Sequence, residues 1–132
     1  MPYIKSTDRL RLARGGKATS AGELNYLLTK RVTEFLGQSE YDLGTLEGDF
    51  KNLIYEYCEN VGFKYQTAND VVGALVCAKM ELTRRAKSIF SKMEIDLIGN
   101  SLDLILQDFY KDVISPYEDM KIKENGDVYN SL

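Results

Sequence analysis

Apolar residues recur at helical intervals along most of the chain, and this periodicity constrains the fold more than any other feature. One apolar stripe runs through residues 24–35 and a second through residues 46–61. Spacings of three and four residues place such side chains on one face of an α-helix. Alternation of apolar and polar residues, which would indicate a strand, extends over only a few positions at a time. The sequence therefore predicts an all-α fold.

Capping and turn residues divide this pattern into about five helices. Ser20 and Glu23 have the spacing of a capping box, which predicts the start of one helix after a basic N-terminal arm and loop, residues 1–20. Gly37 and Gly62 follow the two apolar stripes and are natural C-terminal stops. With 132 residues the chain matches the usual size of one domain. We expect a single compact helical bundle.

The second half of the chain is predicted to hold the longest element. A helical pattern continues from Asp70 to about Ile98, which predicts a long central helix of roughly 43 Å at 1.5 Å per residue if it is unbroken. This length exceeds what a compact domain of this size needs, so the helix is expected either to bend or to project. Gly99 and Asn100 would end it, and Ser101 would cap the last helix. Ser115–Pro116 is predicted to end that helix because proline cannot continue the hydrogen-bond pattern. Residues 117–132 are then expected to form a polar tail.

The amino-acid composition excludes several classes of catalytic and metal-binding site. The chain contains no histidine, which excludes catalytic triads, Cys–His dyads and the usual zinc sites. Its two cysteines, Cys58 and Cys77, lie in helical patterns, and we expect both to be reduced in an intracellular protein. No apolar run approaches the length of a membrane span. We expect no cofactor and no membrane partner.

One acidic pair resembles part of a metal site. Glu56 and Glu59 have the spacing that all-α nucleotide pyrophosphohydrolases use to hold magnesium. Such a site needs a second carboxylate pair, but Glu81, Glu94 and Asp103 each lack a carboxylate three positions later. The metal site is incomplete, and a solvated acidic helix face is the favoured interpretation. The sequence therefore predicts a non-catalytic protein without a metal.

A basic cluster offers a candidate anion site. Arg84, Arg85 and Lys87 form the densest group of positive charge on a predicted helix, and guanidinium groups bind phosphate in a bidentate manner. The alternative is a surface helix face on which these side chains pair with Glu81. The formal net charge of −3 argues against binding of duplex nucleic acid, because this needs a broad basic face.

Tyrosines and a C-terminal turn complete the candidate ligand site. The chain has nine tyrosines and no tryptophan, and tyrosine rings can stack on nucleobases. Tyr65, Tyr117 and Tyr129 are the candidates for this role. Asn125 and Asp127 flank a glycine in a turn sequence that offers amides and acceptors to a ligand. This segment is either a lid over a ligand or a docked tail at a subunit interface.

Three stretches together resemble a known group of proteins. They are residues 22–26 (GELNY), residues 69–75 (NDVVGAL) and residues 116–129, which read PYEDxKIKENGDVY with methionine at x. As a set they resemble small bacteriophage-encoded proteins of unknown function. The resemblance implies a phage origin and a location in the host cytoplasm, and it supplies no catalytic residues. Relative to that family, the segment from Thr83 to Asp108 is an insertion.

Two functions fit these observations. The first is a phage accessory protein that sequesters a small nucleotide, such as a cyclic nucleotide immune signal, and so counters host defence. A small helical domain has little interior volume, so the nucleotide site is expected between the subunits of a homo-oligomer. The second is a helical interaction module that docks on a host or phage protein.

Overall fold

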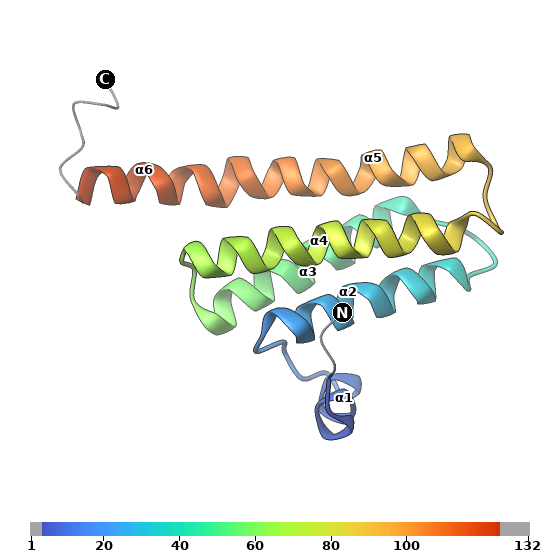
Figure 1. The fold of residues 1–132 in the computed structure, drawn as a ribbon, viewed down its shortest axis with the longest axis horizontal. Coiled ribbons are helices and arrows are strands. Elements are labelled where there is room, and N and C mark those ends of the chain that lie inside the picture. The colour runs from blue at the N-terminus through green and yellow to red at the C-terminus, as the bar shows by residue number, and fades with distance from the viewer. Residues whose placement is uncertain (1–3, 125–132) are drawn as a thin grey trace.

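The computed structural model describes residues 4–124 and shows helices packed side by side (Figure 1). The elements are α1 (Ser6–Ala13), α2 (Ala21–Leu36), α3 (Leu43–Val61), α4 (Tyr65–Ala86), α5 (Lys92–Phe109), the π-helical turn η1 (Tyr110–Ile114) and α6 (Ser115–Glu124). Within residues 4–124 every regular element is helical. This confirms the predicted all-α class and the compact bundle of about five helices.

Four of these helices form the bundle as two antiparallel hairpins, α2 with α3 and α4 with α5. Helix α2 packs along α4, and α3 packs along α5, while α3 and α4 lie diagonally across the bundle and touch little. In Figure 1 α4 crosses in front of α3. The outward faces of α3 and α4 therefore point away from each other, on opposite sides of the molecule.

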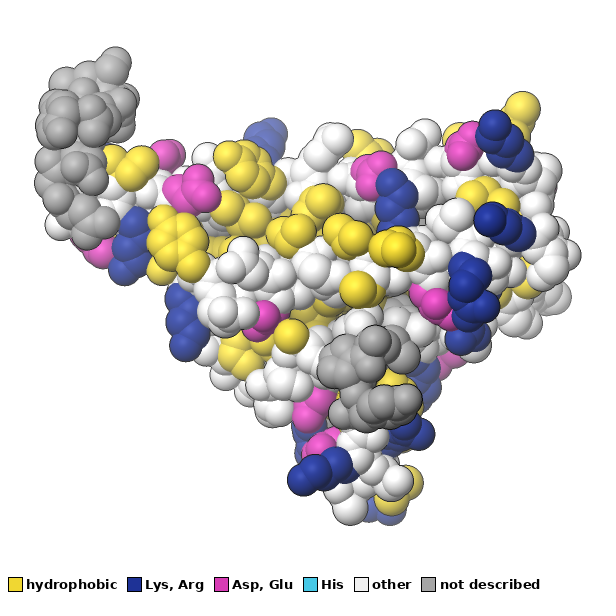
Figure 2. All heavy atoms as spheres, viewed as in Figure 1, with side chains coloured by type: hydrophobic (Ala, Val, Ile, Leu, Met, Phe, Trp, Pro, Cys, Tyr) yellow, Lys and Arg dark blue, Asp and Glu magenta, His cyan; other side chains and the backbone are white. Residues whose placement is uncertain are grey.

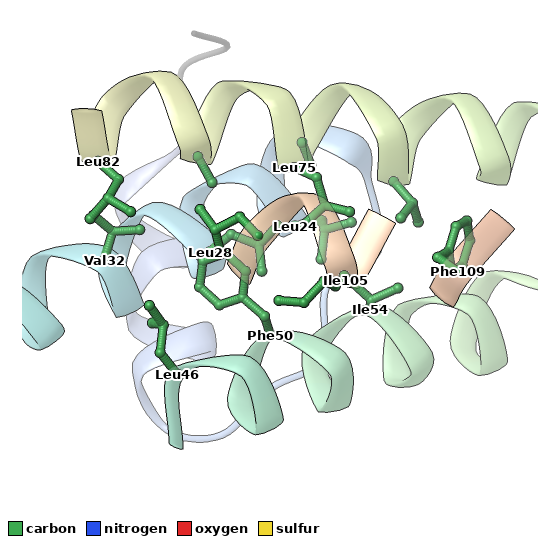
Figure 3. Close-up of a cluster of buried hydrophobic side chains, with 14 of the residues drawn as sticks. Leu24, Leu28, Val32, Leu46, Phe50, Ile54, Leu75, Leu82, Ile105 and Phe109 are labelled. Carbon is green, nitrogen blue, oxygen red and sulfur yellow. The ribbon is translucent and has the colours of Figure 1, made fainter. Parts of the chain in front are cut away.

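The core lies where the two hairpins meet, and it explains the apolar stripes of the sequence (Figure 3). Leu24, Leu28 and Val32 from α2 and Phe50 from α3 are fully buried in it. Helix α4 contributes several small buried residues, among them Ala78. Small side chains let two helix backbones approach closely, which accounts for the extensive packing of α4 on α2.

Local hydrogen bonds set most of the helix ends where the sequence predicts them. The hydroxyl of Ser20 accepts a hydrogen bond from the Glu23 amide, 3.2 Å away, and Gly37 ends α2. Helix α3 ends at Gly62, whose φ of +81° is a conformation that side chains with a Cβ rarely adopt. Helix α4 begins at Tyr65, and the Thr67 hydroxyl donates to the Gly62 carbonyl over 2.7 Å.

The predicted long central helix is wrong, because the chain turns between Ala86 and Lys92. Helix α4 ends at Ala86, and Ser91 and Glu94 form a capping box that begins α5. Phe90 lies in the turn and is buried against Phe35 and Tyr41, with ring centroids 6.4 and 4.6 Å apart. Ser101, predicted as a helix cap, instead lies buried within α5.

The predicted end at Ser115–Pro116 is also wrong. The amide of Ser115 donates to the carbonyl of Tyr110, five residues earlier, so the turn before Pro116 is wider than an α-helical turn. A widened turn accommodates the proline ring, which would collide with the preceding turn of a regular helix. Helix α6 therefore follows without a break, and residues 117–124 of the predicted tail are helical. The longest helix, residues 92–124, is the last one.

No helix in the described part of the chain combines the length and the apolar character needed to cross a lipid bilayer.

Candidate functional site

The outward side of α4 carries the most distinctive surface of the molecule. We call it the α4 face; its residues are Val76, Lys79, Met80, Thr83, Arg84 and Lys87. Met80 and Val76 are 67% and 45% exposed and lie one turn apart on this side of the helix. In Figure 2 apolar side chains run along the middle of this surface, and basic side chains gather towards the end of α4. The α4 face is thus an apolar strip with a basic end.

Packing within the bundle explains why these residues point outward. Ala74, Ala78 and Leu82 are buried, so positions on the opposite side of the same helix must face solvent. Lys79 lies at the edge of the face, and its Nζ lies 2.8 and 2.9 Å from the two carboxylate oxygens of Asp103 on α5. This ion pair closes one side of an open groove of about 510 Å³ that the α4 face lines together with Asp103.

Glu81 forms ion pairs with both candidate arginines. One of its oxygens lies 2.5 Å from Nη2 of Arg84 and also accepts from Nε of Arg85. Hydrogen bonds from Arg84 and Arg85 hold the pKa of Glu81 down at about 2, so the carboxylate stays ionised. The arginines therefore pair with Glu81, as the alternative interpretation anticipated. Arg84 remains 68% exposed and keeps donors that face solvent.

The predicted site residues fall into two separate groups. Arg84 and Lys87 line the same groove, whereas Arg85 is directed towards Thr33 on α2, 3.4 Å away. Tyr65 lies at the other end of α4, 19 positions before Arg84, a distance of about 28 Å along the helix. A small nucleotide is too short to contact both ends of α4 in one subunit.

An aromatic cluster forms around the second group. The ring centroids of Tyr65 and Tyr117 are 5.3 Å apart, and Phe63 lies 4.9 Å from Tyr117. Nζ of Lys121 sits 5.5 Å from the centre of the Tyr117 ring, within range of a cation–π interaction. Tyr65 and Tyr117, two of the candidates for stacking on a base, thus contact each other. Asn125, Asp127 and Tyr129 lie outside the described residues.

The acidic pair lies on the outward side of α3. Glu56 and Glu59 are both exposed. Between residues 4 and 124 no group of three or more His, Cys, Asp or Glu side chains is placed to hold a metal ion. Cys58 and Cys77 are both free thiols; burial raises the pKa of Cys58 to about 11, and Cys77 is exposed. The structure leaves Glu56 and Glu59 as an exposed acidic patch.

Sequence reasoning missed the apolar part of the site. Val76 and Met80 belong to a helix whose core positions include Val71, Leu75 and Ala78. A helical wheel anchored on those residues puts Val76 and Met80 on the opposite side. The sequence signal for this part of the site is a pair of apolar residues, Val76 and Met80, that lie outside the core stripe of the helix, one turn before the basic cluster.

The fold and this surface define the protein as a small all-helical bundle that exposes an amphipathic helix face. A family model described as a domain of unknown function, DUF6899, matches residues 1–101, and the chain belongs to this family. Comparison with curated proteins gave no match, and neither did comparison with solved structures.

Proposed function

We propose that this protein is a non-catalytic interaction module that docks on another protein through the α4 face. The observation that carries this proposal is the position of Met80 and Val76. Both are exposed at the centre of a helix face whose edge is basic. Protein interfaces commonly have an apolar centre within a polar rim. The arrangement supports docking, because removing exposed apolar side chains from water lowers the free energy of the complex.

Met80 and Val76 would supply part of the free energy of docking, and contacts around them would supply the rest. Covering one large apolar side chain contributes about 1.5–3 kcal/mol, and Met80 and Val76 offer two adjacent chains of this kind. Lys79 is already fixed by Asp103 and needs little ordering on binding. Lys87 and Arg84 then select a partner with acidic residues on its contact surface.

Photo-crosslinking tests this proposal with a matched control. A photoreactive residue replaces Met80 in one variant and Met93 in the other; Met93 is 74% exposed and lies on α5, outside the α4 face. In host cells we expect a discrete protein adduct from position 80 and none from position 93. The Met80→Asp substitution, combined with a crosslinker at Val76, should lower the adduct yield at least tenfold. Equal yields from positions 80 and 93 would contradict the proposal.

A second candidate function is sequestration of a small nucleotide, as the sequence suggested. The observation that favours it is the groove itself, because Arg84 and Lys87 share it with Val76 and Met80. Two cations can hold a phosphate while the apolar wall packs on a base. The resemblance to phage proteins would place this activity in the host cytoplasm, against a nucleotide immune signal. Base stacking on Tyr65 and Tyr117 would then require a second subunit, because these rings lie at the far end of α4.

Titration with cyclic nucleotides tests the second candidate. We expect the Arg84→Ala and Lys87→Ala double variant to bind at least tenfold more weakly, and Lys111→Ala, an exposed control on η1, to bind as the natural protein does. Glu81→Gln should bind more tightly, because it removes the negative charge beside Arg84. Native mass spectrometry reports the ligand and the subunit number together. Unchanged affinity in the double variant would remove this groove as the nucleotide site.

A further inference from the structure

The two outward faces of the bundle carry opposite charge. On α3 five exposed residues follow one side of the helix, which we call the α3 face: Gly48, Asn52, Tyr55, Glu56 and Glu59. Its only charged members, Glu56 and Glu59, are both acidic, whereas the α4 face ends in Arg84 and Lys87. Because α3 and α4 are diagonal in the bundle, these faces lie on opposite sides of the molecule. One copy therefore presents an acidic face in the direction opposite to its basic face.

The spacing of the residues on the two faces also matches. Glu56 and Glu59 are three positions apart near the C-terminal end of α3, and Arg84 and Lys87 are three apart near the C-terminal end of α4. When an α3 helix and an α4 helix lie parallel with Glu56 level with Arg84, Glu59 is level with Lys87. The helical rise then brings the preceding turns level as well.

The same alignment places the apolar strip against small or polar surface. Met80 is level with Asn52, and Val76 is level with Gly48, counting back the same number of residues on each helix. A Cβ added at Gly48 meets no atom within 4 Å, so this part of α3 is open to a neighbouring molecule. Tyr55, 37% exposed, lies beside the acidic pair and adds an aromatic edge.

We propose that the partner of the α4 face is a second copy of this chain, which docks by its α3 face. This inference rests on the proposed docking role of the α4 face and names its occupant. Each copy contacts one neighbour through its α4 face and another neighbour through its α3 face. The contact is therefore heterologous and repeats from copy to copy. Since α3 and α4 run in opposite directions in one chain, each copy is rotated by half a turn relative to the last. A half-turn repeat combined with a translation does not close, so the assembly is an open stack.

Charge reversal on the two faces provides the test. The first variant carries Glu56→Lys and Glu59→Lys, and the second carries Arg84→Glu and Lys87→Glu. A control, Lys111→Glu with Lys123→Glu, makes the same change in net charge as the second variant on exposed residues away from both faces. Sedimentation velocity in low salt measures association. Circular dichroism checks that each variant is folded.

We expect the natural chain and the control to associate in low salt and to dissociate in about 0.5 M salt, where screening is strong. Each face variant should be monomeric by itself, and an equimolar mixture of the two should associate again, since its faces are complementary. A monomeric natural chain with a monomeric mixture overturns the proposal. Association of either face variant as strong as that of the natural chain also overturns it. If the proposal fails while position 80 still crosslinks to another protein, the α4 face docks a different partner.

Discussion

Glu23 links the N-terminal helix to the bundle through one carboxylate. It is 8% exposed, and one of its oxygens accepts hydrogen bonds from Arg11 on α1 and from the amide and hydroxyl of Thr19, both 3.0 Å away. The sequence predicted Ser20 and Glu23 as a capping box, and Ser20 does cap α2. The Glu23 side chain, however, binds Thr19 and Arg11, because the side chain of Arg11 reaches it from α1. Local spacing cannot predict that contact between two helices.

The ionisation of Glu23 makes stability depend on pH. Burial by itself would raise the pKa of Glu23, but hydrogen bonds from Arg11 and Thr19 outweigh it and leave the pKa below its usual value. A carboxyl whose pKa is lower in the folded chain stabilises the protein above the unfolded-state pKa. This contribution is lost as the pH falls through the folded-state pKa.

We expect Glu23→Gln to lower the free energy of unfolding by about 1–2 kcal/mol at pH 7, because Arg11 loses a charged partner. The difference from the natural protein should shrink as the pH falls through the lowered pKa of Glu23 in the folded chain, where the natural carboxyl is also protonated. Urea unfolding followed by circular dichroism measures both values. Glu40→Gln, in the exposed loop before α3, is the control and should leave stability unchanged. A pH-independent difference would contradict this account.

Among the helices, the turn from α4 to α5 shows where periodicity misleads. Ile89, Phe90 and Met93 continue an apolar pattern, which suggested one long helix. The Ser91 and Glu94 capping-box signature was present in the sequence and marked the true start of α5. What the sequence does not reveal is that Phe90 packs on Phe35 and Tyr41, residues more than 45 positions earlier. This long-range burial stabilises the turn.

Loss of the Ser91 cap should weaken α5. We expect Ser91→Ala to cost about 1 kcal/mol, because the Glu94 amide loses its partner at the helix N-terminus. Ser88→Ala is a matched control in the same turn, since the Ser88 hydroxyl only reaches the Arg85 carbonyl at 3.4 Å. Thermal unfolding should show a lower midpoint for Ser91→Ala and little change for Ser88→Ala. Equal midpoints for the two variants would argue against the cap.

At the scale of the whole molecule, the sequence predicted the class of fold and most of the core but not the arrangement of the helices. The stripes through residues 24–35 and 46–61 are buried as expected. The two hairpins, however, dock through α2 and α4, and a sequence pattern cannot show which helix faces meet. For the same reason Arg84 and Tyr65 were assigned to one site, although they lie at opposite ends of α4.

Hairpin docking depends on a small residue at the α2–α4 contact. Ala78 is fully buried there, and a larger side chain would push the two helices apart. We expect Ala78→Leu to destabilise the protein by about 1–3 kcal/mol. Val76→Leu, two positions earlier on the exposed face, is the control and should change stability by less than about 0.5 kcal/mol. Denaturant titration distinguishes the two; a neutral Ala78→Leu would show that α2 and α4 do not pack tightly at this position.

The two parts of the continuous helix from Lys92 to Glu124 should differ in how readily they unfold locally. Its first part is anchored in the core by Leu102, Ile105 and Phe109, whereas no residue of α6 is buried. Backbone amides of α6 should exchange with solvent when the helix frays from its C-terminal end, which costs little free energy. Backbone amides of α5 should exchange only when the whole bundle unfolds. The Pro116–Glu124 part of the closing motif thus lies on a segment that can open while the core stays folded, so a ligand that binds its helical form would slow exchange there and, by mass action, also raise the unfolding midpoint of the bundle.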